Sequence, residues 1–361
     1  EHSQDGKPSG LVPQTLAPLL QKRIKLKNHL LTSPPWDPQR NIDKARASAH
    51  KWLLVTCFGY LGYKNARFGR IEAHEAVTAY GREALLRAKE IVEDLGFEVL
   101  HMYVDGLWIQ KKGASKVVDF QPALEAISRG TGLPISLDGI YRWVAFLPSR
   151  GNERVPVPNR YFGVFQDGSL KVRGIEARRG DTPPYIASMQ MEILETLAQN
   201  ETPDIQKVFR LVRRKLAELR GRKIPTEQLV ISQRLSRELE AYRVPSPSAR
   251  AAAQLATAGK NLRPGQFVRY VLTLGSPDVH AWDLPESLDP SRINTERYII
   301  LLTRAAHSIL EPFGVSEAYL KAQVLDQPSC QLSLPNAPRP RSALRKAYRY
   351  SFLADNTPEN A

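Results

Sequence analysis

The sequence predicts an α+β protein in which helices come first, an antiparallel α+β unit follows, and a mainly helical unit ends the chain. Three observations lead to this prediction. Apolar residues recur at helical spacing over about the first 95 residues. The dipeptide Asp105-Gly106 lies between two runs rich in β-branched and aromatic residues, which is a strong signal for a tight hairpin. Helical patterns return from residue 186 onward.

Three helices are expected before the hairpin. Pro13 begins the first of them, and a proline-rich stretch ends it. A second helix is expected over 43–61, because Asp43 is a suitable N-cap. The third spans 71–95 with one apolar side, and Gly96 follows at the position of a C-cap glycine.

Beyond the hairpin the sequence predicts more strands and then a largely helical second half. Strands are expected over 142–147, 161–165, 171–176 and 267–275. Helices are expected over 186–199, 203–220, 226–242, 247–258 and 295–310. The segment from Pro335 onward is rich in proline and arginine, and we expect it to be partly mobile.

The composition favours a polyanionic partner. The 361 residues include 51 Lys and Arg against 37 Asp and Glu, a formal net charge of +14. Nucleic acid is the favoured partner, although RNA-associated, ribosomal and membrane-surface proteins share this property. No window approaches the roughly 20 consecutive apolar residues of a membrane span, so no membrane partner is expected. The two cysteines lie far apart in no ligand spacing, which favours a reducing cytoplasm over a disulfide framework or a zinc site.

Residues 51–69, KWLLVTCFGYLGYKNARFG, resemble the fingers-helix motif of family B DNA polymerases. That motif reads Lys, three residues, Asn-Ser, one residue, Tyr-Gly. Lys51 and Gly59 keep the lysine and the glycine. Phe58 stands at the position of the tyrosine and Val55 at that of the asparagine.

Further blocks in the same order are similar to this family. NRYFGVFQDGSLKVRGIEARRGD resembles its template-binding stretch and the strand that follows, while residues 229–275 and 295–314 resemble its thumb. The fingers motif and the hairpin together are similar to a divergent second branch of archaeal and bacterial enzymes, often described as inactivated. The resemblance implies the C-terminal part of a right-hand polymerase. Its expected parts are a helical fingers remnant (1–66), an antiparallel palm sheet packed by helices (67–185), a mainly helical thumb (186–334) and a basic tail (335–361).

The resemblance implies a DNA-directed DNA polymerase that binds primer–template DNA and dNTP for nucleotidyl transfer in replication or repair. It also implies cytoplasmic, nucleoid-associated localisation. Such transfer uses two divalent ions, Mg²⁺ or Mn²⁺, which carboxylates hold. The family hairpin Tyr-Gly-Asp-Thr-Asp-Ser is Tyr103-Val104-Asp105-Gly106-Leu107-Trp108 here. Asp105 keeps the first carboxylate and the expected catalytic role, but Leu107 replaces the second, so we expect a weakened metal site.

A second carboxylate would have to come from elsewhere. The family's upstream palm motif, Asp followed by Ser-Leu-Tyr-Pro, does not occur in this chain. We expect either a longer gene product, of which this chain is a fragment, or a separate polypeptide to supply it. Glu176, expected on the strand after the palm turn, is a further candidate for a metal ligand.

The resemblance implies two binding sets. Lys51, Phe58 and Gly59 are expected to bind the nucleotide. The residues expected to contact DNA are Arg160, Tyr161, Arg178, Arg179 and Arg263, although Asn159 replaces a family lysine beside them.

Each of these residues also has an interpretation without function. An Asp-Gly pair is common in hairpin turns, a lysine on a helix is usually solvated, and arginines can protect a strand edge. The basic run from Lys207 to Lys215 on one helix can be a solvated face or a DNA contact. The alternative to an active polymerase is a catalytically inactive paralogue that acts as a DNA-binding scaffold or polymerase modulator.

Overall fold

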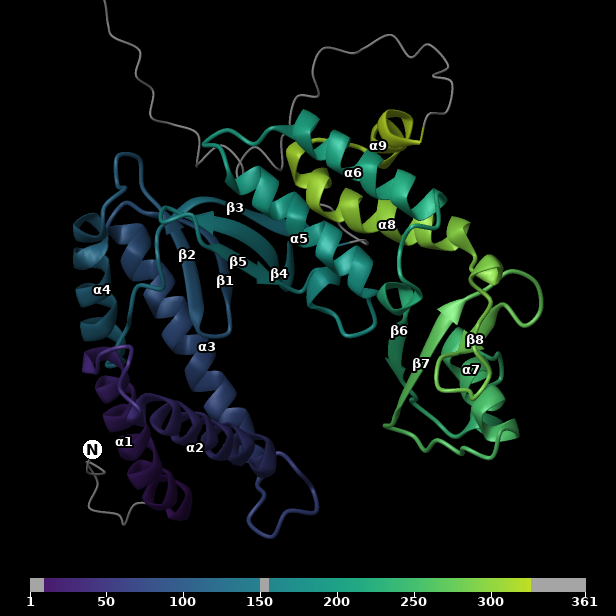
Figure 1. The fold of residues 1–361 in the computed structure, drawn as a ribbon. Coiled ribbons are helices and arrows are strands. Elements are labelled where there is room, and N and C mark those ends of the chain that lie inside the picture. Colours follow the sequence, from purple (N-terminus) through teal and green to yellow (C-terminus); the bar gives the residue numbers. More distant parts are fainter. Residues whose placement is uncertain (1–9, 150–155, 326–361) are drawn as a thin grey trace, which may run out of the picture.

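The computed structural model describes residues 10–149 and 156–325, which form an arch of four regions (Figure 1). A helical arm makes one end of the arch. A hairpin unit and a central sheet covered by helices follow, and a small tip sheet makes the other end. All strand pairs in the described residues are antiparallel, and the predicted α+β class is confirmed. The expected tail over 335–361 lies outside the described residues.

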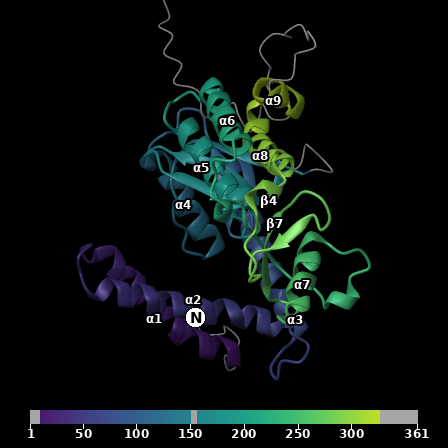
Figure 2. The same cartoon turned by 45° about the vertical axis from the view of Figure 1, so that its right-hand side comes forward.

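The helical arm consists of α1 (Leu11–Thr32) and α2 (Gln39–Leu61), which lie side by side in both views (Figures 1 and 2). No residue of α1 is buried, so the arm has little apolar core of its own. Polar contacts close its turn instead. The guanidinium of Arg40 donates through Nη1 to the carbonyl oxygens of Leu30 (2.6 Å) and Ser33 (2.8 Å). These bonds satisfy acceptors at the end of α1 that have no partner within the helix.

Asp43 is not the N-cap that the sequence predicts. The helix begins earlier, at Gln39, after Pro38, whose fixed φ favours a helix start. Asp43 is buried between the two helices, where its carboxylate accepts from Gln39 Nε2 (3.0 Å) and lies 2.7 Å from His29 Nδ1. The side chain therefore joins α1 to α2 from the helix interior.

The hairpin unit packs a two-stranded sheet against two helices. Its elements are α3 (Ile71–Asp94), β1 (Glu98–Tyr103), β2 (Gly106–Gln110) and α4 (Val117–Thr131). A separate apolar core fills it, formed by Ala88, Val92, Phe97, Phe120, Ala123 and Ile127. The sequence interpretation missed α4, which contains a proline, although its apolar residues recur at helical spacing and a glycine in the left-handed region ends it.

The hairpin turn lies one residue earlier than predicted. Tyr103 pairs with Gly106, so Val104 and Asp105 form the two-residue turn. Val104 has φ 53°, a conformation that a β-branched residue rarely adopts. The pairing of the two strands, and not the local preference of an Asp-Gly dipeptide, decides the turn.

The central sheet has the order β3 (Tyr141–Pro148), β4 (Pro156–Phe165), β5 (Leu170–Arg173). Successive side chains face opposite sides. One face carries Trp143, Ala145, Leu147, Phe162 and Val164 into the main hydrophobic core with α5 (Pro184–Ala198), α6 (Ile205–Arg220) and α8 (Thr295–Leu310). The other face carries Phe146 and Tyr161 toward the hairpin. The sheet is thus buried on both sides.

The tip sheet has the order β6 (Ile231–Arg234), β7 (Phe267–Leu272), β8 (Val279–Ala281), with α7 (Pro247–Thr257) against it. The helix predicted over 226–242 is wrong, since this segment holds β6 between two short 3₁₀ turns. The buried Tyr298 of α8 explains the difference: its hydroxyl donates to the Leu229 carbonyl (2.8 Å) and accepts from the Leu272 amide (2.9 Å). Tertiary pairing with β7 overrides the local helical pattern.

The remaining elements agree with a long helical second half. The helices expected over 186–199, 203–220, 247–258 and 295–310 correspond to α5, α6, α7 and α8. A short last helix, α9 (Glu317–Val324), was not predicted. Among the helices of the described ranges, none is both long and apolar enough to cross a membrane.

We predict that Asp43 stabilises the protein in a pH-dependent way. The hydrogen bond from Gln39, followed by the contact with His29, lowers the pKa of the Asp43 carboxyl. A lowered pKa in the folded state contributes stability above the unfolded value near 3.9, and this is lost as the pH falls through the folded pKa. Asp43→Asn should lower the thermal midpoint at pH 7, and its difference from the parent should shrink as the pH falls through the lowered pKa and disappear well below it. An equal difference at pH 7 and well below the lowered pKa would contradict this, and exposed Asp94→Asn is the control.

Candidate functional site

Asp105 lies exposed at the tip of the β1–β2 hairpin, whereas the side chain of Leu107 points into the structure. Leu107 packs with Val99 and Ile109 against the core of the hairpin unit. The position at which the family carries its second carboxylate is therefore part of a hydrophobic core here. Within residues 10–149 and 156–325, no three His, Cys, Asp or Glu side chains lie close enough together to hold a metal ion. These residues do not fit a two-metal site.

Glu176 is engaged in a polar network, and it lies in a 3₁₀ turn (Glu176–Arg178) rather than on the predicted strand. One carboxylate oxygen accepts from Arg160 Nη2 (3.2 Å) and from the Ser308 hydroxyl (3.1 Å). The other accepts from Gln190 Nε2 (2.8 Å). Both oxygens thus have protein donors, which leaves Glu176 poorly placed to bind a hard cation.

Gln190 completes this network and is fully buried. Its amide nitrogen also donates to the Ala305 carbonyl (2.9 Å), and its amide oxygen accepts from the Ala177 backbone (2.6 Å). Glu176 and Gln190 thereby join the central sheet to α5 and α8. Because the network places Arg160 against Glu176, only 24% of the Arg160 side chain is exposed.

Tyr161 lies in a cluster of four rings between the central sheet and the hairpin, which we call the aromatic seam. It consists of His101, Trp108, Phe146 and Tyr161. The Trp108 ring lies 5.1 Å from Tyr161 and 5.6 Å from Phe146, both edge to face. Burial in the seam lowers the pKa of His101, so its imidazole is neutral at pH 7. Tyr161 is only 6% exposed and here acts in packing.

The residues expected to bind the nucleotide share the exposed side of α2 or its end. Lys51 is exposed and forms no salt bridge with any described residue. The Phe58 ring stacks on His74 with ring centroids 4.1 Å apart. A Cβ at Gly59 would meet no atom within 4 Å, so the backbone there is open to a ligand. None of these residues contacts Asp105 by a hydrogen bond or ion pair in the described structure.

Arg178 and Arg179 lie at the end of the 3₁₀ turn, not on a strand pair as predicted. Arg178 is exposed without a salt bridge in the described residues. Arg179 forms a two-pronged contact with the carboxylate of Asp181 (2.9 and 2.7 Å), which raises the pKa of its guanidinium. Only Arg178 of this pair is therefore free for a phosphate.

Arg263 belongs to a group of exposed cations around the tip sheet. We call this group the tip cations: Arg234, Arg237, Arg243, Lys260 and Arg263. None forms a salt bridge with a described residue, although Arg234 lies over the Phe267 ring at 5.0 Å. The sequence interpretation missed all but Arg263, because they are scattered over strand ends and loops and no run marks them.

Part of the basic run on α6 is neutralised, in contrast to the tip. Arg214 and Lys215 both contact Glu192, at 3.3 and 2.5 Å. Arg213 donates to the backbone of Gln323 (2.6 Å). The helix lies at the top of the arch, away from the tip sheet (Figure 1). The basic run on α6 is thus less available to an anion than the tip cations, because three of its five side chains already have partners in the protein.

We predict that Glu176 acts mainly through the network. Glu176→Ala removes the carboxylate acceptor of Arg160 and one of the two acceptors of the Gln190 amide nitrogen, and it should lower the free energy of unfolding by about 2 kcal/mol. Urea denaturation measures this, with exposed Glu90→Ala as the control. Glu176→Gln should leave Mn²⁺ affinity unchanged, as read by electron paramagnetic resonance. A loss of Mn²⁺ binding with unchanged stability would instead make Glu176 a ligand.

We also predict that restoring the family carboxylate is costly. Leu107→Asp places an ionisable group among apolar side chains and should destabilise the fold by about 2–4 kcal/mol. Leu107→Asn removes the same packing without the charge, and thermal unfolding of both variants separates the two effects. An aspartate variant as stable as the parent would show that this side chain can turn away from the core.

The sequence profile described as DNA polymerase family B matches residues 2–117 and 159–313. The chain is 29% identical over 316 residues to DNA polymerase 2 of Aeropyrum pernix, covering 87% of this chain and 38% of that protein. It is 29% identical over 329 residues to a DNA polymerase of Desulfurococcus sp. (strain Tok), covering 88% and 41%.

A solved structure shares the architecture. The family B DNA polymerase of Pyrobaculum calidifontis matches with a TM-score of 0.56 and 26% identity, over 86% of this chain and 39% of that one. The chain therefore spans about two fifths of the length of these relatives. With a profile match over most of its residues and this shared fold, the chain belongs to DNA polymerase family B.

Proposed function

We propose that the chain forms the DNA- and nucleotide-binding part of a DNA-directed DNA polymerase that acts in replication or repair. The observation that carries the proposal is the distribution of cations. The five tip cations have no acidic partner in the described residues, while Arg214 and Lys215 on α6 do. Cations without acidic partners retain their attraction for phosphates and release counterions when they bind DNA.

Each part of the chain expected from the sequence then has a role in this proposed polymerase. The arm over 1–66 acts as fingers, 67–185 as palm, and 186–334 as thumb. The thumb grips the primer–template duplex through the tip cations, and Arg178 adds a contact from the palm. Lys51 meets the triphosphate of the incoming dNTP as a compact point charge. Phe58, held by its stack on His74, and the open backbone at Gly59 lie below the new base pair.

The metal site is the incomplete part of this proposal. In this chain Asp105 is the residue that would hold a divalent ion, Mg²⁺ or Mn²⁺, whose chemistry would be Lewis-acid activation for nucleotidyl transfer. Asp105 offers one carboxylate, which is too little for two hard ions. We propose that another strand, from the rest of a longer protein or from a separate polypeptide, brings the missing aspartate. The hairpin has room for a further strand at its edge, since β1 and β2 pair only with each other among the described strands.

A second candidate function follows from Leu107. Its packing in the core of the hairpin unit replaces a charged ligand by an apolar contact. A catalytically inactive paralogue that binds primer–template DNA, as a scaffold or as a modulator of another polymerase, needs the cations but not the metals. Either function would place the chain at the nucleoid in the cytoplasm.

The first test is binding of a labelled primer–template, measured by fluorescence anisotropy over a series of salt concentrations. Arg237→Ala/Arg263→Ala should reduce the slope of log K against log salt by about 0.9 per residue. The matched control is Lys207→Ala/Arg210→Ala on α6, which removes the same charge from exposed positions. If the control lowers the slope and the tip variant does not, the tip is not the DNA-binding surface.

Primer extension then separates the two candidate functions. The chain and its Asp105→Asn variant are compared with Mg²⁺ and with Mn²⁺, in the presence and absence of the remaining polypeptide. Extension that the variant loses supports the polymerase. Duplex binding without extension under every condition supports the DNA-binding paralogue.

A further inference from the structure

The helix α1 exposes an apolar stripe on a side that α2 does not cover. No residue of α1 is buried, although a helix in a protein normally owes its stability to a buried apolar face. The residues of the stripe recur at steps of three and four, and they are Ala17, Leu20, Ile24, Lys27 and Leu31. We call these five residues the arm seam. Their spacing is that of the a and d positions of a heptad, which face a partner helix in a coiled coil.

A different side of α1 packs on α2. Its half-buried residues lie about a third of a turn from the arm seam, and they are Leu16, Leu19, Arg23, Leu26 and Leu30. The bonds from Arg40 to the carbonyl oxygens of Leu30 and Ser33 hold the end of α1 against the start of α2. The arm seam is therefore turned outward before any partner binds.

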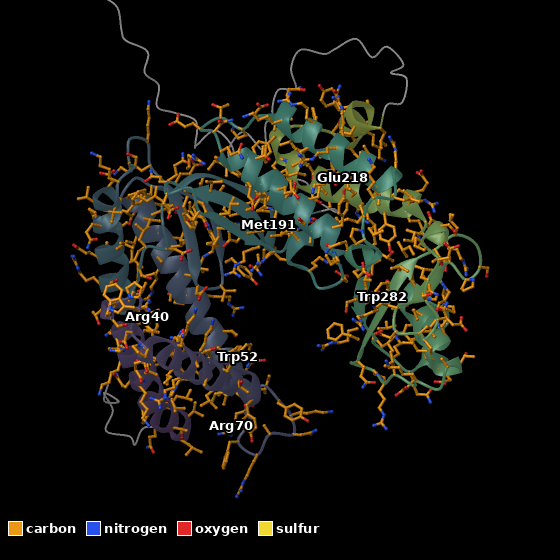
Figure 3. The ribbon with its side chains drawn as sticks, viewed as in Figure 1. Arg40, Trp52, Arg70, Met191, Glu218 and Trp282 are labelled. Atoms are coloured by element: carbon orange, nitrogen blue, oxygen red, sulfur yellow. The ribbon has the colours of Figure 1, made fainter. Side chains whose placement is uncertain are left out.

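The large apolar side chains of the arm seam are open to solvent. Leu20 is 44% exposed, Ile24 is 40% exposed and Leu31 is 82% exposed. Trp36 lies in the turn that follows α1 and is also 82% exposed. Figure 3 labels Arg40 at this turn of the arm. Exposed apolar residues that share one surface mark an interaction site, and tryptophan is among the residues that contribute most to the affinity of interfaces.

Lys27 is the one charged member of the arm seam, and it indicates the charge of the partner. It lies between two apolar members, is exposed, and forms no salt bridge with a described residue. Residues 11–61 contain eight Lys and Arg but only two acids, Asp37 and Asp43. Both of these acids lie beside His29, at 3.9 and 2.7 Å. A partner with a carboxylate opposite Lys27 and further acids beside it complements this surface.

We propose that the arm seam binds an acidic amphipathic helix of a partner protein. The seam is about 21 Å long, which a partner helix of about four turns covers. The apolar side of that helix packs on Leu20, Ile24 and Leu31, and one of its carboxylates pairs with Lys27. A single charged residue within an apolar seam fixes the register and the choice of partner. The inference goes beyond the proposed function, in which the nucleotide contacts of the arm lie on α2.

Other occupants complement the arm seam less well. A second copy of the chain, or its own basic tail over 335–361, would set cations against cations. Nucleic acid would gain from the charge but not from the aliphatic side chains, which neither stack on bases nor bind phosphates. A lipid surface favours an apolar residue at the position within the stripe where Lys27 lies.

The test uses the full chain and two synthetic peptides of about 21 residues. The acidic peptide carries Leu at the a and d positions of three heptads, except for one central Glu, and it carries Glu at the flanking e and g positions. The basic peptide has Lys in place of every Glu. Fluorescence anisotropy of the labelled peptides should show binding of the acidic peptide and none of the basic peptide.

Two matched pairs of variants locate the contact. Lys27→Glu should weaken binding of the acidic peptide by about tenfold, and replacing the central Glu of the peptide by Lys should restore it. Lys22→Glu changes the charge equally on another side of α1 and should weaken binding by no more than about twofold at physiological salt. Leu31→Ser should weaken binding by about tenfold, whereas Leu11→Ser, exposed but outside the seam, should not.

Several results would overturn the inference. One is an acidic peptide that does not bind, or that binds no better than the basic one. Sedimentation of the chain alone as a dimer that Leu31→Ser abolishes would make a second copy the occupant. Weaker binding of phosphatidylserine vesicles or of a DNA duplex by Leu31→Ser would assign the seam to lipid or to nucleic acid.

The result is separable from the proposed function. Leu31→Ser should bind primer–template as the parent does, because the tip cations are unchanged. A chain that binds primer–template but not the acidic peptide refutes this inference alone, and one that binds the peptide but no primer–template refutes the proposed function alone. Circular dichroism before each titration confirms that these exposed substitutions leave the fold intact.

Discussion

The central sheet, buried on both faces, is the constraint on which the rest of the structure depends. One face enters a core shared with α5, α6 and α8, and this core continues to the tip sheet through residues such as Tyr270 and Tyr298. The other face meets the hairpin unit through the aromatic seam. Two hydrophobic cores are therefore fixed relative to each other by one three-stranded sheet. The distance between the hairpin that carries Asp105 and the cations of the tip depends on this sheet.

The network around Glu176 reinforces the same junction with polar contacts. A buried amide at Gln190 would destabilise the core if any of its groups lacked a partner, and here each has one. The carboxylate of Glu176, for which the sequence suggested a metal-binding role, is part of the junction between the sheet and α8.

Some cations of the chain form salt bridges within the fold, and others remain free to bind an anion. Arg160, Arg179, Arg214 and Lys215 are held by carboxylates, so much of their charge is neutralised within the fold. The tip cations and Arg178 lack such partners among the described residues. The tip is thus one of the surfaces at which the net charge of the chain stays available to an anion.

The sequence by itself determined the class, most helices and the hairpin, because these depend on apolar periodicity and on residues that favour turns. It also determined that a carboxylate is replaced at Leu107 and which cations exist. The tertiary structure decided the rest. Pairing with β7 and the Tyr298 hydroxyl make a strand of 231–234 against its local pattern, and strand register moves the turn to Val104-Asp105. The availability of each cation was likewise decided by tertiary structure, because the acids that neutralise Arg160 and Lys215 lie 16 and 23 residues away in the chain.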